Sequence, residues 1–108
     1  MLLRLSRKSI KTDFQKRDKA VAKKDRKLFL STQLKNLEIK GSYSTGYLKL
    51  SKLKSKVLHL DKDDKNSNSW IVFVKERYYQ NRKFSHKGYL LYKIISDNGE
   101  FVIYDIVW

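Results

Sequence analysis

Apolar residues recur at helical spacing through the first part of the chain. At separations of 4, 7 and 7 positions they form one stripe on a helix: Ile10, Phe14, Val21 and Leu28. Cations occupy the opposite arc of the same helix: Lys8, Lys11, Lys16, Lys19, Lys23, Arg26 and Lys27. The pattern predicts an amphipathic helix over 7–24. Because Asp25 can cap a new turn, we expect a short second helix over about 25–33, then a connection through Gly41 and Ser42.

The middle of the chain supports two interpretations. A third short helix within 43–55 is favoured by apolar residues at helical spacing: Tyr47, Leu50, Leu53 and Val57. Leu48 and Leu50 also alternate as in a strand. A strand is expected to begin at Val57, and the polar segment 61–69 is typical of a loop.

The last forty residues predict an antiparallel meander. Strands are expected at 70–79, 88–95 and 101–108, which are rich in β-branched and aromatic residues, and the segment near Val57 adds a fourth. Asn98-Gly99 favours a tight hairpin, whereas 80–85 predicts a looser connection. In the first of these strands one face carries Trp70, Val72, Val74 and Tyr78, and the other carries Ile71 and Phe73. With both faces partly apolar, the sheet is expected to curl over itself or to meet a partner.

Several segments carry a family resemblance. They are FQKRDKAVAKKD at 14–25, KLFLSTQ at 27–33, the strand at 70–79, GYLLYKI at 88–94 and FVIYDIVW at 101–108. Over 7–108 the chain is similar to the nuclear transport factor 2-like superfamily. The resemblance implies an α+β fold in which a long amphipathic N-terminal helix, with one or two short helices, packs into a curved, cone-like antiparallel β-meander. It implies a single domain over 1–108, either complete or a fragment of a longer chain. The segment 41–56 departs from the family pattern, since it is short and Lys-rich.

Positive charge is concentrated in the first half of the chain. The formal net charge is +14, and residues 1–60 carry 17 Lys and Arg against 4 Asp and Glu. This asymmetry favours an anionic partner such as nucleic acid or another anionic polymer. Lysines that only solvate the surface would give the same excess, and the ratio of 19 Lys to 6 Arg fits that alternative.

Few residues suit catalysis or metal binding. The chain has no Cys, which excludes disulfides and thiolate chemistry, and its two histidines are His59 and His86. Pairing of a histidine with Asp97 or Asp105 is conceivable, but we expect both histidines at the surface. The acidic residues at 61–64 lack the order of a calcium loop, and no Gly-rich phosphate motif occurs. We therefore expect no catalytic residue, metal or cofactor.

Aromatic residues in the meander alternate with cations. Such sheets can stack unpaired bases, although the RNP pattern is absent. The aromatic residues in or beside the meander are Tyr78, Tyr79, Phe84, Tyr89, Tyr92, Phe101, Tyr104 and Trp108, and the cations among them are Arg77, Arg82, Lys83, Lys87 and Lys93. Most of these aromatic residues are expected in the core. Those expected to line a pocket or the sheet face are Phe14, Trp70, Tyr78, Tyr92 and Tyr104. The carboxylates of Glu76, Glu100 and Asp105 are expected to repel phosphate there.

Three functions are compatible with these patterns. We favour a non-catalytic module of unknown process, alone or as the accessory domain of a larger protein. It would bind a small ligand or a protein partner and could form a homodimer through the sheet face. The alternative is a basic nucleic-acid-binding protein, for example a ribosome-associated one, that uses the cationic helix face together with Lys49, Lys52, Lys54 and Lys56. The third is a small cone-fold enzyme. No transmembrane segment is expected. The sequence leaves the compartment open: cytoplasmic for the chain as it stands, or extracytoplasmic for a fragment of a secreted protein.

Overall fold

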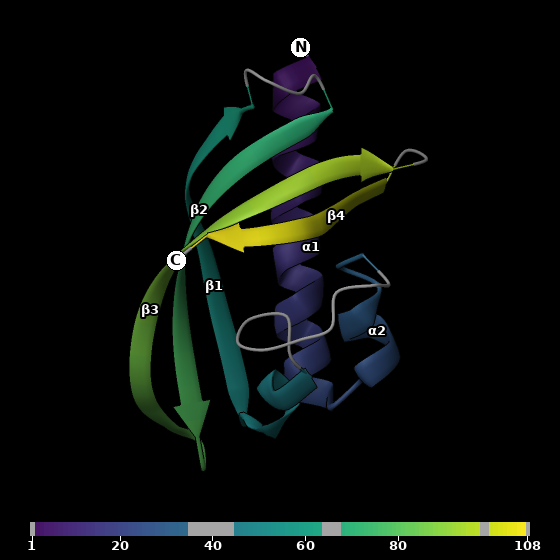
Figure 1. Ribbon diagram of the computed structural model, residues 1–108. Helices are drawn as coiled ribbons and strands as arrows, with labels where there is room; N and C mark the ends of the chain where they lie inside the picture. Colours follow the sequence, from purple (N-terminus) through teal and green to yellow (C-terminus); the bar gives the residue numbers. More distant parts are fainter. Residues whose placement is uncertain (1, 35–44, 64–67, 98–99, 108) are drawn as a thin grey trace.

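The computed structural model describes residues 2–34, 45–63, 68–97 and 100–107. In chain order the elements are α1 (Leu2–Lys23), α2 (Arg26–Leu30), the 3-10 helix η2 (Thr45–Lys49), β1 (Lys52–Lys62), β2 (Ser69–Gln80), β3 (Lys83–Asp97) and β4 (Glu100–Val107). Figure 1 shows the long helix α1 lying against one side of the sheet. The predicted α+β class, with a long N-terminal helix and a β-meander, is confirmed.

The first helix ends where the sequence indicates. Lys24 adopts a left-handed backbone with φ of 58°, and the Asp25 N–H donates to the carbonyl of Ala20 at 2.8 Å, which closes the helix. Asp25 then caps α2, because its Oδ1 accepts from the Leu28 N–H at 3.0 Å. The second helix is shorter than expected, since residues after Leu30 pair with β4: the Ile103 N–H donates to the carbonyl of Thr32 at 2.9 Å.

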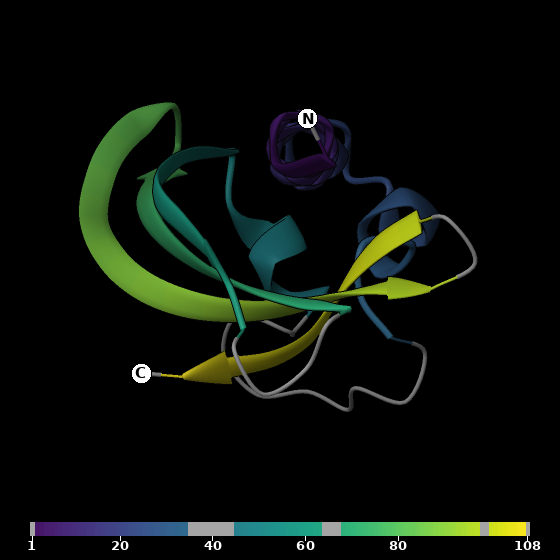
Figure 2. The ribbon, with the colours of Figure 1, turned by 90° about the horizontal axis from the view of Figure 1, so that it is seen from above.

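The four strands form one antiparallel meander in the order β1-β2-β3-β4. Figure 2 shows the sheet curving round η2, with α1 and α2 along its open side. Below, the inner face is the side of the sheet turned toward α1, and the outer face is the opposite side. On β2 the residues Trp70, Val72, Val74 and Tyr78 are buried on the inner face, as the alternation predicts.

Several predicted boundaries were wrong. The first helix begins at Leu2 rather than at residue 7. The connection between β2 and β3 is only Asn81 and Arg82, with φ of 51° and 65°, so β3 begins at Lys83 rather than at Gly88. Two residues of this conformation match the twist of a hairpin, which lets both strands continue to the turn. The third helix ends at Lys49, and β1 already begins at Lys52. The predicted connection at Gly41-Ser42 and the turn at Asn98-Gly99 lie outside the described residues.

The hydrophobic core has two parts under the inner face. The larger joins α1 to the middle of the sheet: Ile10, Phe14, Leu60, Trp70, Val72, Val74, Leu90, Tyr92, Ile94, Ile103 and Ile106. The smaller joins the end of α1 to α2, η2 and the start of β1: Ala20, Val21, Phe29, Leu50, Leu53 and Tyr78. Every helix in the described residues is too short or too polar to cross a membrane.

Candidate functional site

A buried carboxylate lies at the centre of the inner face. Glu76 on β2 is completely buried and accepts hydrogen bonds from three tyrosines. Tyr47 and Tyr78 donate to Oε1 at 2.6 and 2.7 Å, and Tyr92 donates to Oε2. Because η2, β2 and β3 each supply one phenol, the carboxylate ties three elements together. A substrate could reach Glu76 only by displacing these phenols.

A buried arginine completes the polar interior. Arg17 on α1 is fully buried, and its Nη1 donates at 3.0 Å to both Thr32 Oγ1 and Gln33 Oε1. The guanidinium carbon lies 4.3 Å from the ring centroid of Phe29. This side chain therefore fastens α1 to the segment that follows α2 and pairs with β4.

The phenol of Tyr78 stays protonated in this environment. Burial, and then the nearby Glu76 carboxylate, raise the pKa of Tyr78. The phenol therefore keeps the proton that it donates to Glu76. Gly88 on the neighbouring strand leaves room for it, because a Cβ there would lie 3.0 Å from the Tyr78 hydroxyl oxygen. The interior is built to hold the fold, and the Glu76 carboxylate is already engaged by three phenols.

The sequence-predicted pocket residues divide between two places. Phe14 and Tyr92 are buried together, with their rings edge to face at 5.0 Å, and Trp70 lies in the same core cluster. Tyr78 joins them through the shared hydrogen bonds to Glu76. Tyr104 does not, since it is half-buried on β4 and its hydroxyl bonds Ser69 Oγ at 2.9 Å. Four of the five predicted residues therefore belong to the interior.

A second carboxylate links α1 to the edge strand β1. Asp18 accepts from the backbone N–H of Ser55 at 2.8 Å and from its hydroxyl at 2.7 Å. Burial raises the pKa of Asp18 to about 6, and the two hydrogen bonds from Ser55 oppose that rise. The contact satisfies a backbone donor on β1, which lies at the edge of the sheet that the described residues form.

We expect Asp18→Asn to gain stability relative to the wild type as the pH rises from about 4 to about 7. The folded-state pKa lies above the ordinary 3.8, so the folded protein holds the proton more tightly. In the wild type the protonated Asp18 therefore contributes to stability below pH 4, and this contribution is lost as the pH rises through about 6. Asparagine can still bond Ser55 but does not titrate. Urea unfolding of both proteins at four pH values measures the difference. The control is Asp25→Asn, which changes an exposed carboxylate. A difference in the free energy of unfolding between Asp18→Asn and the wild type that did not change with pH would contradict the prediction.

The outer face of the sheet carries aligned cations at one end. Strand pairing places Lys54 opposite Arg77 and Arg77 opposite Lys87, and in the next row Lys56 lies opposite Lys75. Lys52 adds a sixth cation beside Tyr79. We call these six residues the basic face: Lys52, Lys54, Lys56, Lys75, Arg77 and Lys87. Within these rows the described outer positions include no Asp or Glu.

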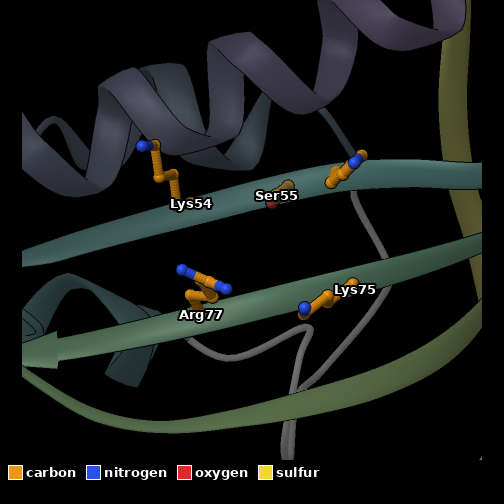
Figure 3. A pocket seen from close by; sticks show the side chains of 5 residues that line it. Lys54, Ser55, Lys75 and Arg77 are labelled. Atoms are coloured by element: carbon orange, nitrogen blue, oxygen red, sulfur yellow. The ribbon is translucent and has the colours of Figure 1, made fainter.

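A hollow opens in the basic face between β1 and β2. Its volume is about 400 Å³, and it is lined by Lys54, Ser55, Lys56, Lys75 and Arg77. Figure 3 shows Lys54 on β1 and Lys75 and Arg77 on β2 gathered around this space. The lining offers ammonium and guanidinium donors, a set suited to phosphate, sulfate or carboxylate groups.

Aromatic rings border the same rows. Phe84 lies next to Tyr79 at one end, and Tyr89 lies next to Lys75 at the other. Both are unusually exposed, at 53% and 50%. The Arg77 guanidinium carbon lies 5.9 Å from the Phe84 ring centroid, and Tyr89 stacks on Phe73 at 5.9 Å with an interplanar angle of 21°.

The structure buries two charged residues that the sequence analysis did not place in the core. Glu76 was expected to repel phosphate from the sheet, but it points into the core and not onto the outer face. Arg17 was not singled out. The burial of both residues could have been predicted from backbone periodicity alone. Glu76 continues the inner alternation of β2. Arg17 lies three residues after Phe14 and four before Val21 in the buried stripe.

The predicted helix cations and histidines lie at or near the surface. Of the seven cations, Lys16 is half-buried and the rest are exposed: Lys8, Lys11, Lys19, Lys23, Arg26 and Lys27. His59 pairs with Asp61 at 2.7 Å on the exposed side of β1, whereas the side chain of Asp97 lies outside the described part of the structure. His86 is exposed and lies 4.6 Å from the ring of Tyr78.

Comparison with known proteins identifies the fold. The crystal structure of an NTF-2-like protein of unknown function from Shewanella oneidensis MR-1 matches with a TM-score of 0.70. The match covers 93% of this chain and 99% of that chain at 10% sequence identity. No family model and no curated protein sequence matches the chain. Similarity at this level of identity reports architecture and not activity. The helix, the curved meander and this match together show that the chain has an NTF-2-like fold.

Proposed function

We propose that this chain is a non-catalytic binding module that holds a polyanion on the basic face of its sheet. The observation that carries the proposal is the alignment of six cations in adjacent rows, with a hollow of about 400 Å³ between them. Clustered cations above a low-dielectric core raise the local concentration of an anionic chain and speed its association.

The arrangement is unfavourable for the sheet by itself. Like charges directly opposite on neighbouring strands are destabilising, and here Lys54 faces Arg77 while Lys56 faces Lys75. A sheet that only needed solubility could alternate the signs of its charges. An anionic partner would turn this repulsion into attraction, which supports binding as the role of the face.

The interior supports a binding role over catalysis. Among the described residues Glu76 is the completely buried carboxylate of the cone, and three phenols already donate to it. A general base must come within hydrogen-bond reach of the proton it abstracts. The tyrosines occupy that position around Glu76, so we propose that the outer face, not the interior, meets the ligand.

The cationic face of α1 is the competing site. All of its cations except Lys16 are exposed, and Asp13 and Asp25 lie among them in the sequence. The two faces can be separated because each offers three cations for removal. Lys54→Gln/Lys75→Gln/Arg77→Gln is the sheet variant, and Lys11→Gln/Lys19→Gln/Lys23→Gln is the matched helix variant. Both lower the net charge by three.

We expect the sheet variant to bind heparin and inorganic polyphosphate about tenfold more weakly or worse, and the helix variant to lose much less. Loss of specific contacts should also flatten the salt dependence, since each phosphate contact contributes about 0.7 to its logarithmic slope on a flexible strand. Fluorescence anisotropy from about 50 to 300 mM salt measures both effects. If both variants lost equal affinity, total charge and not one face would account for binding. A larger loss of affinity in the helix variant would place the site on α1. Either result would overturn the proposal.

A further inference from the structure

We propose that the polyanion is a single-stranded nucleic acid whose bases stack on Phe84 and Tyr89. This inference rests on the proposed function, because it places the phosphates on the basic face. The two rings lie at opposite ends of that face on β3, and Lys87 lies between them. A strand that follows β3 would meet an aromatic ring, a cation and a second aromatic ring in turn.

Exposure of the rings is the first argument. Three large apolar side chains in the described residues stand out as exposed: Phe84, Tyr89 and Leu58. Two of the three border the basic face, although apolar side chains of this size are usually buried. Stacking on unpaired bases would cover them, and such stacking contributes substantially to binding whatever the base sequence.

The positions of the rings are the second argument. Tyr89 is backed by Phe73 at 5.9 Å in a near-parallel arrangement, and Phe84 is flanked by Tyr79 and by the Arg77 guanidinium. The rings are thereby supported by neighbours instead of extending into solvent alone. Less conformational freedom is then lost when a base stacks on either ring.

Charge complementarity selects this occupant over a second copy of the chain. A symmetric dimer through the same face would place two sets of six cations against each other. A duplex would satisfy the cations but would keep its bases paired and unavailable to the rings. A sulfated polysaccharide would supply charge without the aromatic bases.

Labelled oligonucleotides test the proposal on the full chain. We expect (dT)12 and U12 to bind about tenfold or more tightly than an abasic strand of 12 phosphates, and more tightly than the (dT)12·(dA)12 duplex. The variant Phe84→Ser/Tyr89→Ser should remove the preference for (dT)12 over the abasic strand. Its heparin affinity should stay within about twofold of the wild type, because its cations are intact.

Two further measurements keep the test decisive. Leu58→Ser removes an exposed apolar side chain from β1, a strand that is not paired with β3, and is the matched control, expected to keep the preference. The Tyr89 ring protons of the wild type should shift upfield when (dT)12 is added, a readout that needs no variant. Equal affinity for (dT)12 and the abasic strand, or no shift, would overturn the stacking proposal while heparin binding kept the proposed function intact. If the sheet variant bound heparin as tightly as the wild type, both the stacking proposal and the proposed function would be overturned.

Discussion

Glu76→Leu is expected to lower the free energy of unfolding by about 3–5 kcal/mol. The substitution removes the carboxylate that accepts from Tyr47, Tyr78 and Tyr92, all at or near the buried centre of the fold. A buried donor that loses its acceptor costs about 1–3 kcal/mol. Leucine supplies similar volume but no acceptor, so the loss should come from the hydroxyls and not from a cavity. Urea unfolding followed by tryptophan fluorescence measures it.

Two controls separate this effect from a general sensitivity of the sheet. Glu100→Leu makes the same change at an exposed position on β4 and should change the free energy of unfolding by less than about 1 kcal/mol. Tyr92→Phe should be less harmful in the Glu76→Leu background than in the wild type, because its partner is already gone. If Glu76→Leu and Glu100→Leu were equally mild, the carboxylate would not be the structural centre we describe.

Phe14→Ala is expected to cost about 3–5 kcal/mol in the same assay. Phe14 on α1 is 2% exposed, and its ring packs edge to face on Tyr92 at 5.0 Å. Removal of the ring leaves a cavity between the helix and the sheet that the surrounding strands can close only in part. The loss should appear as a lower urea midpoint with an unchanged slope.

Phe84→Ala is the matched control for this prediction. It removes the same ring from an exposed position on β3 and should change stability by less than about 1 kcal/mol. The pair also separates two kinds of aromatic residue in this chain: those that build the core and those we assign to binding. Similar losses for both variants would contradict the assignment of Phe14 to the core.

Much of the fold could be predicted from local patterns. The apolar stripe that includes Ile10, Phe14 and Val21 predicted α1, and the alternation from Trp70 to Tyr78 correctly assigned the inner face of β2. Boundaries were less predictable. The helical spacing of Tyr47, Leu50 and Leu53 favoured a helix, yet β1 already includes Leu53 because its alternation with exposed lysines buries it against α1 and Tyr78.

The candidate sites were predicted less completely. The lysines of β1 and the aromatic residues of β3 were each recognised as separate features, but nothing in their spacing placed them on one surface. Glu76 was expected on the outside, although its own strand period puts it inside. The helical position of Arg17 predicts burial, but its charge predicts exposure, since an arginine is seldom fully buried.

Local physics and chain-wide geometry therefore contributed different things. The sequence determines which residues share a helix stripe or a strand face, because these relations depend on backbone periods of 3.6 and 2 residues. Only the tertiary structure decided that Lys54 lies opposite Arg77, and that phenols from η2, β2 and β3 meet at Glu76. Those relations depend on strand register, which turn length and bulges set, and a slip of one residue would exchange the inner and outer faces of a strand.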